Sequence, residues 1–385
     1  MTSIGYVVSR WGAPTQTFVR REAEAVAALG LDVTALSLRR PAPTDLPVPV
    51  TYLTPGRVLL HAAIAVAARP GRSLRILGSV VRRTRPRLLP AQLWASLVGL
   101  AWAQRGLLRN RSPHAHFGWV AATAAWAGAS WEGVPYTVVL HAFELHTTRL
   151  HDRFTAVPLR AALRCFVISS RDRGIVAERW GVDATILHMG VPEAWLEAQY
   201  SAVVEHDVIV AVGSLVEKKG HAVLLEAVAR CPVPFRLEIL GAGPLEAELL
   251  ALRDELGLAD RVELLGAVPE NEVRRRVRRA WVCALAAIEA RSGDRDGIPV
   301  ALMEAMALGT PVVTTRVGGI PELVDGAGLL VAPGDPGAMA DALALVREPS
   351  VRSQLSELGR GRIAEDWTVE RSARLVAEVH GVVVG

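Results

Sequence analysis

Short apolar runs alternate with longer stretches of helical periodicity along the whole chain. In the first half, strands are predicted at four apolar runs, namely Ile4–Val8, Val33–Leu38, Thr137–Leu140 and Cys165–Ile168. A helix is predicted to begin at Thr17, after the loop that follows the first run. Strands that alternate with helices favour parallel sheets with crossover connections, so the predicted fold class is α/β.

The same pattern starts again in the second half. An apolar run at Val208–Val212 is followed by Gly213, a charged loop and a helical stretch from His221 to Arg230. Because 385 residues exceed what one ordinary core holds, we expect two Rossmann-like domains. Five further strands are predicted in this half, at Arg236–Leu240, Arg261–Leu264, Val282–Leu285, Thr310–Thr314 and Gly328–Val331.

The domain bounds follow from the point at which the pattern restarts. Residues 1–198 are predicted to form the N-terminal domain and residues 208–366 the C-terminal domain, with 199–207 as the linker. The final helix, within residues 367–385, is a candidate to cross back onto the first domain.

The composition is that of a folded protein, with 51% hydrophobic and 21% charged residues and a formal charge of +4. The small basic surplus accompanies no recognisable nucleic-acid-binding module, so no nucleic-acid partner is expected. Cys165, Cys231 and Cys283 lie in or beside apolar runs, which indicates buried thiols in a reducing compartment. The N-terminus lacks the features of a signal peptide, which favours a cytoplasmic location.

One segment of the first half, residues 57–111, stands apart in its charge. It holds eleven arginines and no acidic residue, interleaved with apolar runs such as Leu74-Arg75-Ile76-Leu77. Basic amphipathic helices of this kind favour anionic membrane surfaces, which predicts a peripheral membrane association. An arginine-decorated helical insertion that packs on its own domain explains the pattern equally well. No run reaches the roughly 18 apolar residues of a spanning helix.

The stretch from Gly293 to Pro311 carries the clearest chemistry. Pro299 suits a first helical turn and Gly309 a C-terminal cap, so a helix of about ten residues is predicted between them. Its N-terminal N–H groups, beside Gly297 and Ile298, are suited to bind a diphosphate. Asp296 lies before this anion site, and Glu304 lies inside the helix, where a carboxylate can accept hydrogen bonds from a ribose diol. Without further support, the same residues describe an ordinary capped helix with solvated acids.

This stretch resembles the GT-B glycosyltransferases of family 4, whose hallmark is two glutamates separated by seven residues; here the pair is Asp296 and Glu304. The resemblance implies a retaining transfer from a nucleotide-diphosphate sugar, with Glu304 on the ribose. It also implies two facing Rossmann-like domains with the active site in the cleft between them. The donor-binding backbone would be that of Gly297, Ile298, Pro299 and Val300.

A second block, from Val212 to Gly220, resembles the family's glycine-rich loop at the start of the donor domain. The resemblance implies that Lys219 neutralises the departing diphosphate, whereas Lys218 is expected to be solvated. Ser214 stands where the family usually has arginine, so one of two expected cations is missing from its usual place. Further donor contacts are implied at the glycines of this loop and of the next strand end, namely Gly213, Gly241 and Gly243.

In the first domain, Ser9 to Phe18 resembles the opening of exopolysaccharide-type members of the family. Gly12 would let the backbone approach the donor phosphates or the acceptor. Thr15 and Gln16 would face the acceptor, with Gln16 in place of the usual glutamate. The strand that ends at His141 resembles the family's segment in which a histidine contacts the transferred sugar. Glu144, three residues later, is an acceptor-side candidate.

The expected function is therefore sugar transfer from a UDP- or GDP-sugar to a saccharide or lipid-linked acceptor in surface polysaccharide or glycolipid biosynthesis. The resemblance implies no metal and no cofactor, although Asp294-Arg295-Asp296 has the form of a metal-binding Asp-x-Asp motif. His114 and His116 would point the same way on a strand, but no third ligand lies nearby in the sequence.

Two alternatives stay open. The departures at Ser214, Asp296 and Gln16 are compatible with a catalytically silent homologue that binds a nucleotide sugar or a partner enzyme. A nucleotide-sugar epimerase shares the two-domain architecture and would need no acceptor.

Overall fold

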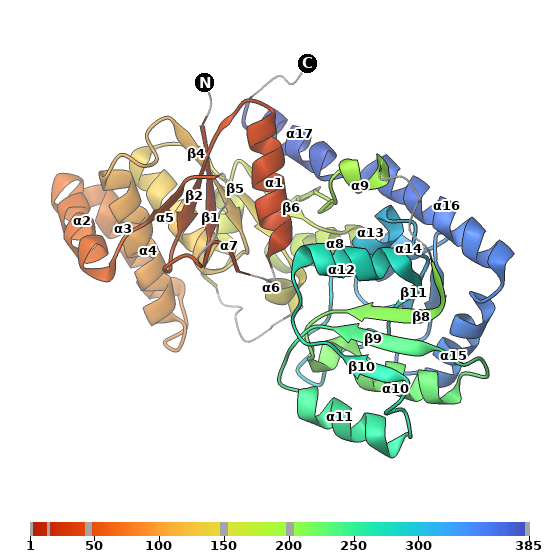
Figure 1. Ribbon diagram of the computed structural model, residues 1–385. Coiled ribbons are helices and arrows are strands. Elements are labelled where there is room, and N and C mark those ends of the chain that lie inside the picture. Colours follow the sequence, from red (N-terminus) through yellow and green to blue (C-terminus); the bar gives the residue numbers. More distant parts are fainter. Residues whose placement is uncertain (1–2, 14–15, 43–47, 147–152, 198–203, 382–385) are drawn as a thin grey trace. The chain divides into compact units, whose positions relative to one another are not determined.

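The computed structural model describes residues 3–13, 16–42, 48–146, 153–197 and 204–381 (Figure 1). The chain divides into two compact units. Unit 1 comprises residues 1–189 and 369–385, and unit 2 comprises residues 190–368. Thr15 and most of the predicted linker, residues 199–203, lie outside the described residues.

Unit 1 is built on a seven-stranded parallel sheet with the order β3-β2-β1-β4-β5-β6-β7. Its strands are β1 (Ser3–Val8), β2 (Asp32–Ser37), β3 (Val50–Tyr52), β4 (Arg111–His116), β5 (Thr137–Leu140), β6 (Arg164–Val167) and β7 (Thr185–Ile186). Its helices are α1 (Thr17–Ala28), α2 (Pro55–Ala68), α3 (Pro70–Arg83), α4 (Leu89–Gln104), α5 (Val120–Glu132), α6 (Ala142–His146), α7 (Ala156–Ala161), α8 (Ser170–Trp180) and α17 (Val369–Val379).

Unit 2 is built on a six-stranded parallel sheet with the order β10-β9-β8-β11-β12-β13. Its strands are β8 (Glu205–Val212), β9 (Arg236–Leu240), β10 (Val262–Leu264), β11 (Ala280–Leu285), β12 (Val312–Thr315) and β13 (Leu329–Val331). Its helices are α9 (Ala194–Glu197), the single 3₁₀ turn η2 (Glu217–Lys219), α10 (His221–Arg230), α11 (Glu246–Glu255), α12 (Glu270–Arg279), α13 (Val300–Ala307), α14 (Ile320–Val324), α15 (Pro336–Leu345) and α16 (Pro349–Asp366).

Both sheets have the arrangement that creates a ligand site in α/β proteins. In each, the first strand is central and the chain adds strands on one side before crossing to the other, between β1 and β4 and between β8 and β11. Ligands in such sheets bind outside the carboxyl ends of the strands, where the order reverses. Each unit therefore has one position where functional side chains are expected to gather.

The boundary between the units falls after Met189, nine residues earlier than predicted. Val191 explains the shift, because it forms a β-bridge with Thr368 and its backbone N–H donates to the carbonyl of Trp367 at 3.0 Å. These bonds tie the segment to unit 2. Helix α17 packs on α1 and so lies within unit 1 (Figure 1).

The arginine-rich segment forms three helices that are integral to unit 1. Helices α2 and α3 both pack on α4, and α4 packs closely on α5. Val58 of α2 and Val80 of α3 are buried in the core. The segment thus packs on its own domain through one face of its helices. A second face of α2 and α3 remains exposed.

Candidate functional site

Backbone segments come very close together at the carboxyl ends of β8 and β9. A Cβ atom at Gly241 would lie 1.9 Å from the carbonyl oxygen of Gly213, and one at Gly243 would lie 2.5 Å from that of Leu215. The backbone N–H of Gly213 also donates to the carbonyl of Leu240 at 3.0 Å. Only glycine fits at positions 241 and 243, because a side chain at either position would clash with the neighbouring backbone.

The loop after β8 brings Lys219 to the end of β11. Its Nζ lies 2.8 Å from Oδ2 of Asp296, and the two side chains are 15% and 10% exposed. The aliphatic stem of Lys219 runs beside Gly213, with Cδ and Cε 3.2 Å from where a Cβ of that glycine would lie. Two residues singled out independently in the sequence therefore form an ion pair at the reversal point of the sheet.

Lys218, which was expected to be solvated, forms ion pairs instead. Its Nζ lies 3.1 Å from Oδ2 of Asp294 and 3.8 Å from Oδ1 of Asp296, and its side chain is 22% exposed. The single turn η2 directs both lysines toward the loop after β11, which carries both aspartates. Each carboxylate of the Asp-x-Asp sequence thus faces an ammonium group.

Helix α13 begins at Val300 and has eight residues, somewhat fewer than the ten expected. Gly297, Ile298 and Pro299 precede it and are buried, and the Gly297 carbonyl accepts from the backbone N–H of Gly319 at 2.9 Å. Glu304 is half-buried on this helix. Together with burial, its charge raises the pKa of the Cys283 thiol, on β11, to about 12.

In unit 1, His141 directly follows β5 and is 5% exposed. Its backbone N–H and that of Gly118 both donate to Oε1 of Glu144, each at 2.8 Å. Burial raises the pKa of Glu144 to about 7. Glu144 therefore joins the loops after β4 and β5, a structural contact that its sequence position did not indicate.

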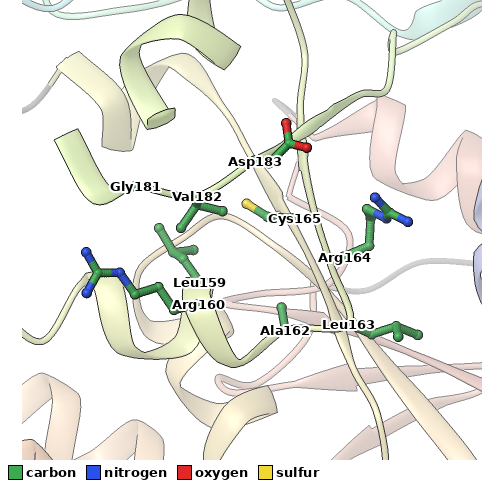
Figure 2. Close-up of a pocket in the computed structure, with 9 residues that line it drawn as sticks. All are labelled: Leu159, Arg160, Ala162, Leu163, Arg164, Cys165, Gly181, Val182 and Asp183. Atoms are coloured by element: carbon green, nitrogen blue, oxygen red, sulfur yellow. The ribbon is translucent and has the colours of Figure 1, made fainter. Parts of the chain in front are cut away.

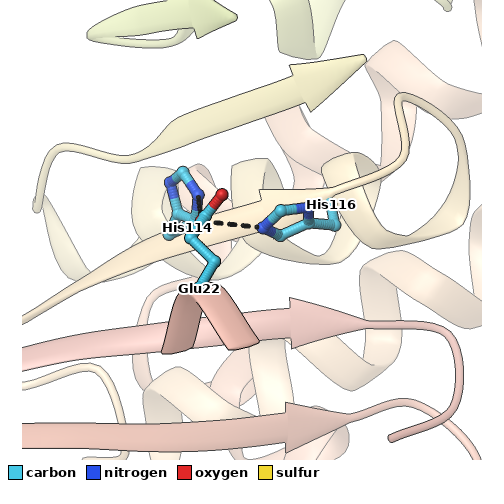
Figure 3. A group of neighbouring side chains, drawn as sticks. All are labelled: Glu22, His114 and His116. Carbon is cyan, nitrogen blue, oxygen red and sulfur yellow. Dashed lines mark hydrogen bonds and ion pairs between the residues drawn. The ribbon is translucent and has the colours of Figure 1, made fainter. Parts of the chain in front are cut away.

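A cluster of polar side chains is buried under this loop. Oε1 of Glu22, on α1, lies 3.1 Å from Nε2 of His114 and 3.2 Å from Nε2 of His116, both on β4 (Figure 3). The hydroxyl of Tyr6 donates to the same oxygen at 3.0 Å. Nδ1 of His116 in turn lies 3.2 Å from Nε2 of His141.

Burial lowers the pKa of His114 and lowers that of His141 well below its usual value. Burial on its own would raise the pKa of Glu22, but the neighbouring imidazoles of His116 and His114 outweigh it and lower the pKa. The cluster thus holds one ionised carboxylate among buried imidazole rings.

The remaining N-terminal candidates lie between β1 and α1. Gly12 has a positive φ of 76° in the turn after β1, which favours glycine. Gln16 directly precedes α1, its side chain makes no cap hydrogen bond, and its backbone N–H donates to the Ala13 carbonyl at 2.9 Å. Thr15, the other acceptor-side candidate, is outside the described residues.

A pocket of about 230 Å³ lies in unit 1 near the amino end of β6, at the end of the strands opposite to His141 (Figure 2). It surrounds Cys165 near the start of β6, whereas His141 follows the end of the neighbouring parallel strand. Burial, with a contribution from Glu144, raises the pKa of Cys165 to about 12, so the thiol is protonated. The pocket contains none of the predicted site residues, and it is lined by Leu159, Arg160, Ala162, Leu163, Arg164, Cys165, Gly181, Val182 and Asp183.

Glu22 was not predicted from the sequence, and His114 and His116 were given no role there. Two signals were present. Glu22 occupies a buried position of α1 together with Val19, Ala23 and Val26, where an apolar residue is expected. Histidines two residues apart on a strand share one face. Only their third partner, Glu22 on α1, could not be identified from spacing along the sequence.

The two parallel sheets, each with candidate residues at the carboxyl ends of its strands, define the GT-B class of fold. Solved structures with this fold cover nearly the whole chain. Alr3699/HepE of Anabaena in complex with UDP matches with a TM-score of 0.72 at 17% identity, over 98% of both chains. Sucrose-phosphate synthase of Thermosynechococcus elongatus matches with a TM-score of 0.73 at 19% identity, over 99% of this chain and 98% of that one.

Residues 206–347 match the sequence model of the glycosyl transferases group 1 family. WcaL of Salmonella typhimurium, whose name assigns it to colanic acid biosynthesis as a glycosyltransferase, is 36% identical over 214 residues. The match covers 53% of this chain and 50% of WcaL. The amylovoran biosynthesis glycosyltransferase AmsK of Erwinia amylovora is 41% identical over 143 residues, which cover 35% of this chain and 34% of AmsK. The chain thus spans about half the length, or less, of these curated relatives.

Proposed function

We propose that this protein is a retaining glycosyltransferase that moves a sugar from a nucleotide-diphosphate sugar to a hydroxyl of a saccharide or lipid-linked acceptor. The observation that carries the proposal is the Lys219–Asp296 pair beside the start of α13. The names of WcaL and AmsK support a role in exopolysaccharide biosynthesis. The UDP bound to the Anabaena protein favours a UDP-sugar over a GDP-sugar as donor.

The roles follow from charge and position. A diphosphate at the start of α13 would compete with Asp296 for the ammonium group of Lys219, since both are anions within its reach. Asp296, released from this pair, would accept hydrogen bonds from the sugar, and Glu304 from the ribose. Lys219 would then lie beside the oxygen on which charge develops as the nucleoside diphosphate departs. That phosphate would help to deprotonate the incoming hydroxyl, and no metal or cofactor is required.

The experiment is a thermal-shift and turnover panel of UDP-, GDP- and ADP-sugars, each with and without EDTA. We expect one nucleotide class to stabilise the protein and to be hydrolysed slowly in the presence of EDTA. Both effects should disappear in Glu304→Ala. Binding that never leads to turnover with any acceptor would indicate a silent homologue. Interconversion of donor sugars without an acceptor would indicate an epimerase, and absence of nucleotide binding would refute the site.

We further propose that the exposed face of α2 and α3 binds an anionic membrane surface, where a lipid-linked acceptor would be available. None of the helices formed by the described residues combines the length and apolar character needed to cross a bilayer. Yet five large hydrophobic residues project from these two helices, with exposures of 40% to 63%. They are Leu59, Leu60, Ile64, Leu74 and Val81. Exposed arginines accompany them at positions 57, 69, 72, 75, 82, 83, 85 and 87.

Apolar side chains that enter the interface and cations that meet anionic headgroups act together in such surfaces. A groove of about 560 Å³ lies along α3 and is lined in part by Arg72, Arg75, Arg82 and Arg83. The groove would place several guanidinium groups around one phosphate.

Charge reversal on α3 tests this second proposal. The double variant Arg82→Glu, Arg83→Glu should bind anionic vesicles at least roughly 30-fold more weakly, since each surface cation contributes about 1 kcal/mol. Co-sedimentation with vesicles of phosphatidylglycerol and phosphatidylcholine measures the effect. The matched control, Arg39→Glu with Arg40→Glu, reverses the same charge at two exposed arginines of unit 1 outside these helices. Equal losses in both variants, or no binding by the wild type, would refute the proposal.

A further inference from the structure

A chain of hydrogen bonds buried in unit 1 connects Glu22 to His141. It runs from Oε1 of Glu22 to Nε2 of His116 at 3.2 Å, and from Nδ1 of His116 to Nε2 of His141 at 3.2 Å. Glu22 is 3%, His116 0% and His141 5% exposed. Water therefore has little access to these bonds. In each of them, the atom that carries the proton is the donor and sets the direction of the hydrogen bond.

The proton positions follow from the carboxylate. An ionised Glu22 only accepts, so His114 and His116 must both carry their proton on Nε2. When His116 holds this one proton, its Nδ1 is an acceptor, and His141 donates to it from Nε2. The remaining nitrogen of His141, Nδ1, makes no hydrogen bond to another described residue. It is left with an unprotonated lone pair.

The far side of the cluster agrees with this assignment. Oγ1 of Thr137 lies 2.6 Å from Nδ1 of His114, and Nε2 of His380 lies 3.1 Å from Oγ1 of Thr137. Both bonds are satisfied if the hydroxyl donates to His114 and His380 donates to the hydroxyl. With one ionised carboxylate, this set of proton positions satisfies each of these contacts.

A metal ion would require the opposite arrangement. The ligand atoms of Glu22, His114 and His116 lie within 4.8 Å of one another, which is close enough to hold one ion. A ligating histidine presents an unprotonated nitrogen to the metal, so the proton of His116 would move to Nδ1. Nε2 of His141 would then have to accept instead of donate. The tautomer of His141 therefore distinguishes the two arrangements.

The ring of His141 is held from the sides as well. Phe117 and Phe18 contact it with ring centroids 4.5 Å and 5.0 Å away. Phe117 adopts a positive φ of 75°, which is uncommon for a non-glycine residue and marks a constrained backbone next to the cluster. The backbone N–H of His141 is fixed by Glu144 at 2.8 Å.

We propose that Glu22 and His116 are positioning residues for His141: they hold its ring with the Nε2 proton directed inward, so that Nδ1 is the atom that accepts a hydrogen bond from a substrate hydroxyl. The role of His141 toward the sugar rests on the proposed function. The direction of the hydrogen-bond chain does not.

The first test is therefore independent of activity. Long-range ¹H–¹⁵N correlation spectra of the histidine-labelled protein report the tautomer of each ring, and loss of one signal set in His141→Gln assigns this residue among the ten histidines. We expect the Nε2–H tautomer of His141 in the wild type. We expect a mixture of tautomers in His116→Ala and Glu22→Gln. The Nδ1–H tautomer, or one equivalent of bound metal by elemental analysis, would overturn the proposal.

The second test is kinetic and uses His380→Ala as the matched control, because His380 belongs to the cluster but not to the path from Glu22 to His141. With the donor found active, His116→Ala and Glu22→Gln should lower kcat by roughly 10- to 100-fold with little change in the KM of the nucleotide. His380→Ala should stay within about twofold of the wild type. Equal losses in all three variants would indicate a purely structural cluster and overturn the proposal. If no donor is turned over, the proposed function fails, and the tautomer test still decides the direction of the chain.

Discussion

Lys219→Ala should lower kcat/KM for the nucleotide sugar by roughly 100- to 1,000-fold, which is the usual effect of removing one fixed group that stabilises developing charge. Lys219 is suited to this role because its ammonium group is held at 2.8 Å from Asp296 and is only partly exposed. Once the diphosphate has replaced Asp296 beside it, this cation needs no further reorganisation when the nucleoside diphosphate departs. Initial rates with the donor identified in the nucleotide panel measure the effect.

Lys218→Ala is the matched control for this prediction. Both lysines lie on the same turn and both face the aspartates of the loop after β11, so each variant removes one of two neighbouring cations. The loss of thermal stability should therefore be similar and modest, since both pairs are partly exposed. The loss of kcat/KM should be confined to Lys219→Ala. Equal kinetic losses in the two variants would show that Lys219 has no special position.

The largest expected change in stability comes from Gly220→Ala. Gly220 has a φ of 63°, and a Cβ atom there would lie 1.7 Å from the carbonyl oxygen of Ala286. The strained backbone alone costs about 1 to 2 kcal/mol for a non-glycine residue. The clash with a buried backbone adds to this, because neither the loop nor β11 can move apart without losing hydrogen bonds. We expect the free energy of unfolding to fall by at least about 3 kcal/mol.

Gly257→Ala separates strain from clash. Gly257 has nearly the same φ, 66°, but nothing lies within 4 Å of the Cβ position. Its substitution should cost only about 1 kcal/mol, measured for both variants by urea denaturation followed by circular dichroism. A similar cost for the two glycines would contradict the close approach of the loop after β8 to the end of β11.

The strands predicted from the sequence are those with continuous apolar runs. β5 and β9 were predicted at their observed bounds, and β8 and β11 within a few residues. Three strands of unit 1 were missed. β3 and β7 have only three and two residues, too few to form a recognisable pattern. β4 contains two histidines because its partner is the buried carboxylate of Glu22, so the usual apolar signal of a central strand is absent.

The candidate site also contains residues that the sequence predicts and contacts that it does not predict. The candidate residues of unit 2 lie on the segments that follow β8, β9 and β11, and the rule of carboxyl ends already places these segments together. The Lys218–Asp294 pair and the path from Glu22 to His141 depend on which side chains meet across separate elements. Spacing along the chain carries no information on such contacts.

Helix α17 gives unit 1 an unusual order of assembly. The polypeptide that completes this unit is separated from the rest of it by residues 190–368, which form unit 2. At about 5 to 20 residues per second, their synthesis takes roughly 10 to 35 s. Throughout that interval the face of α1 that α17 covers remains open, and Thr137 lacks its bond from His380. During translation unit 2 is therefore the first of the two to have all its elements present, and unit 1 reaches its native state only after α17 has emerged.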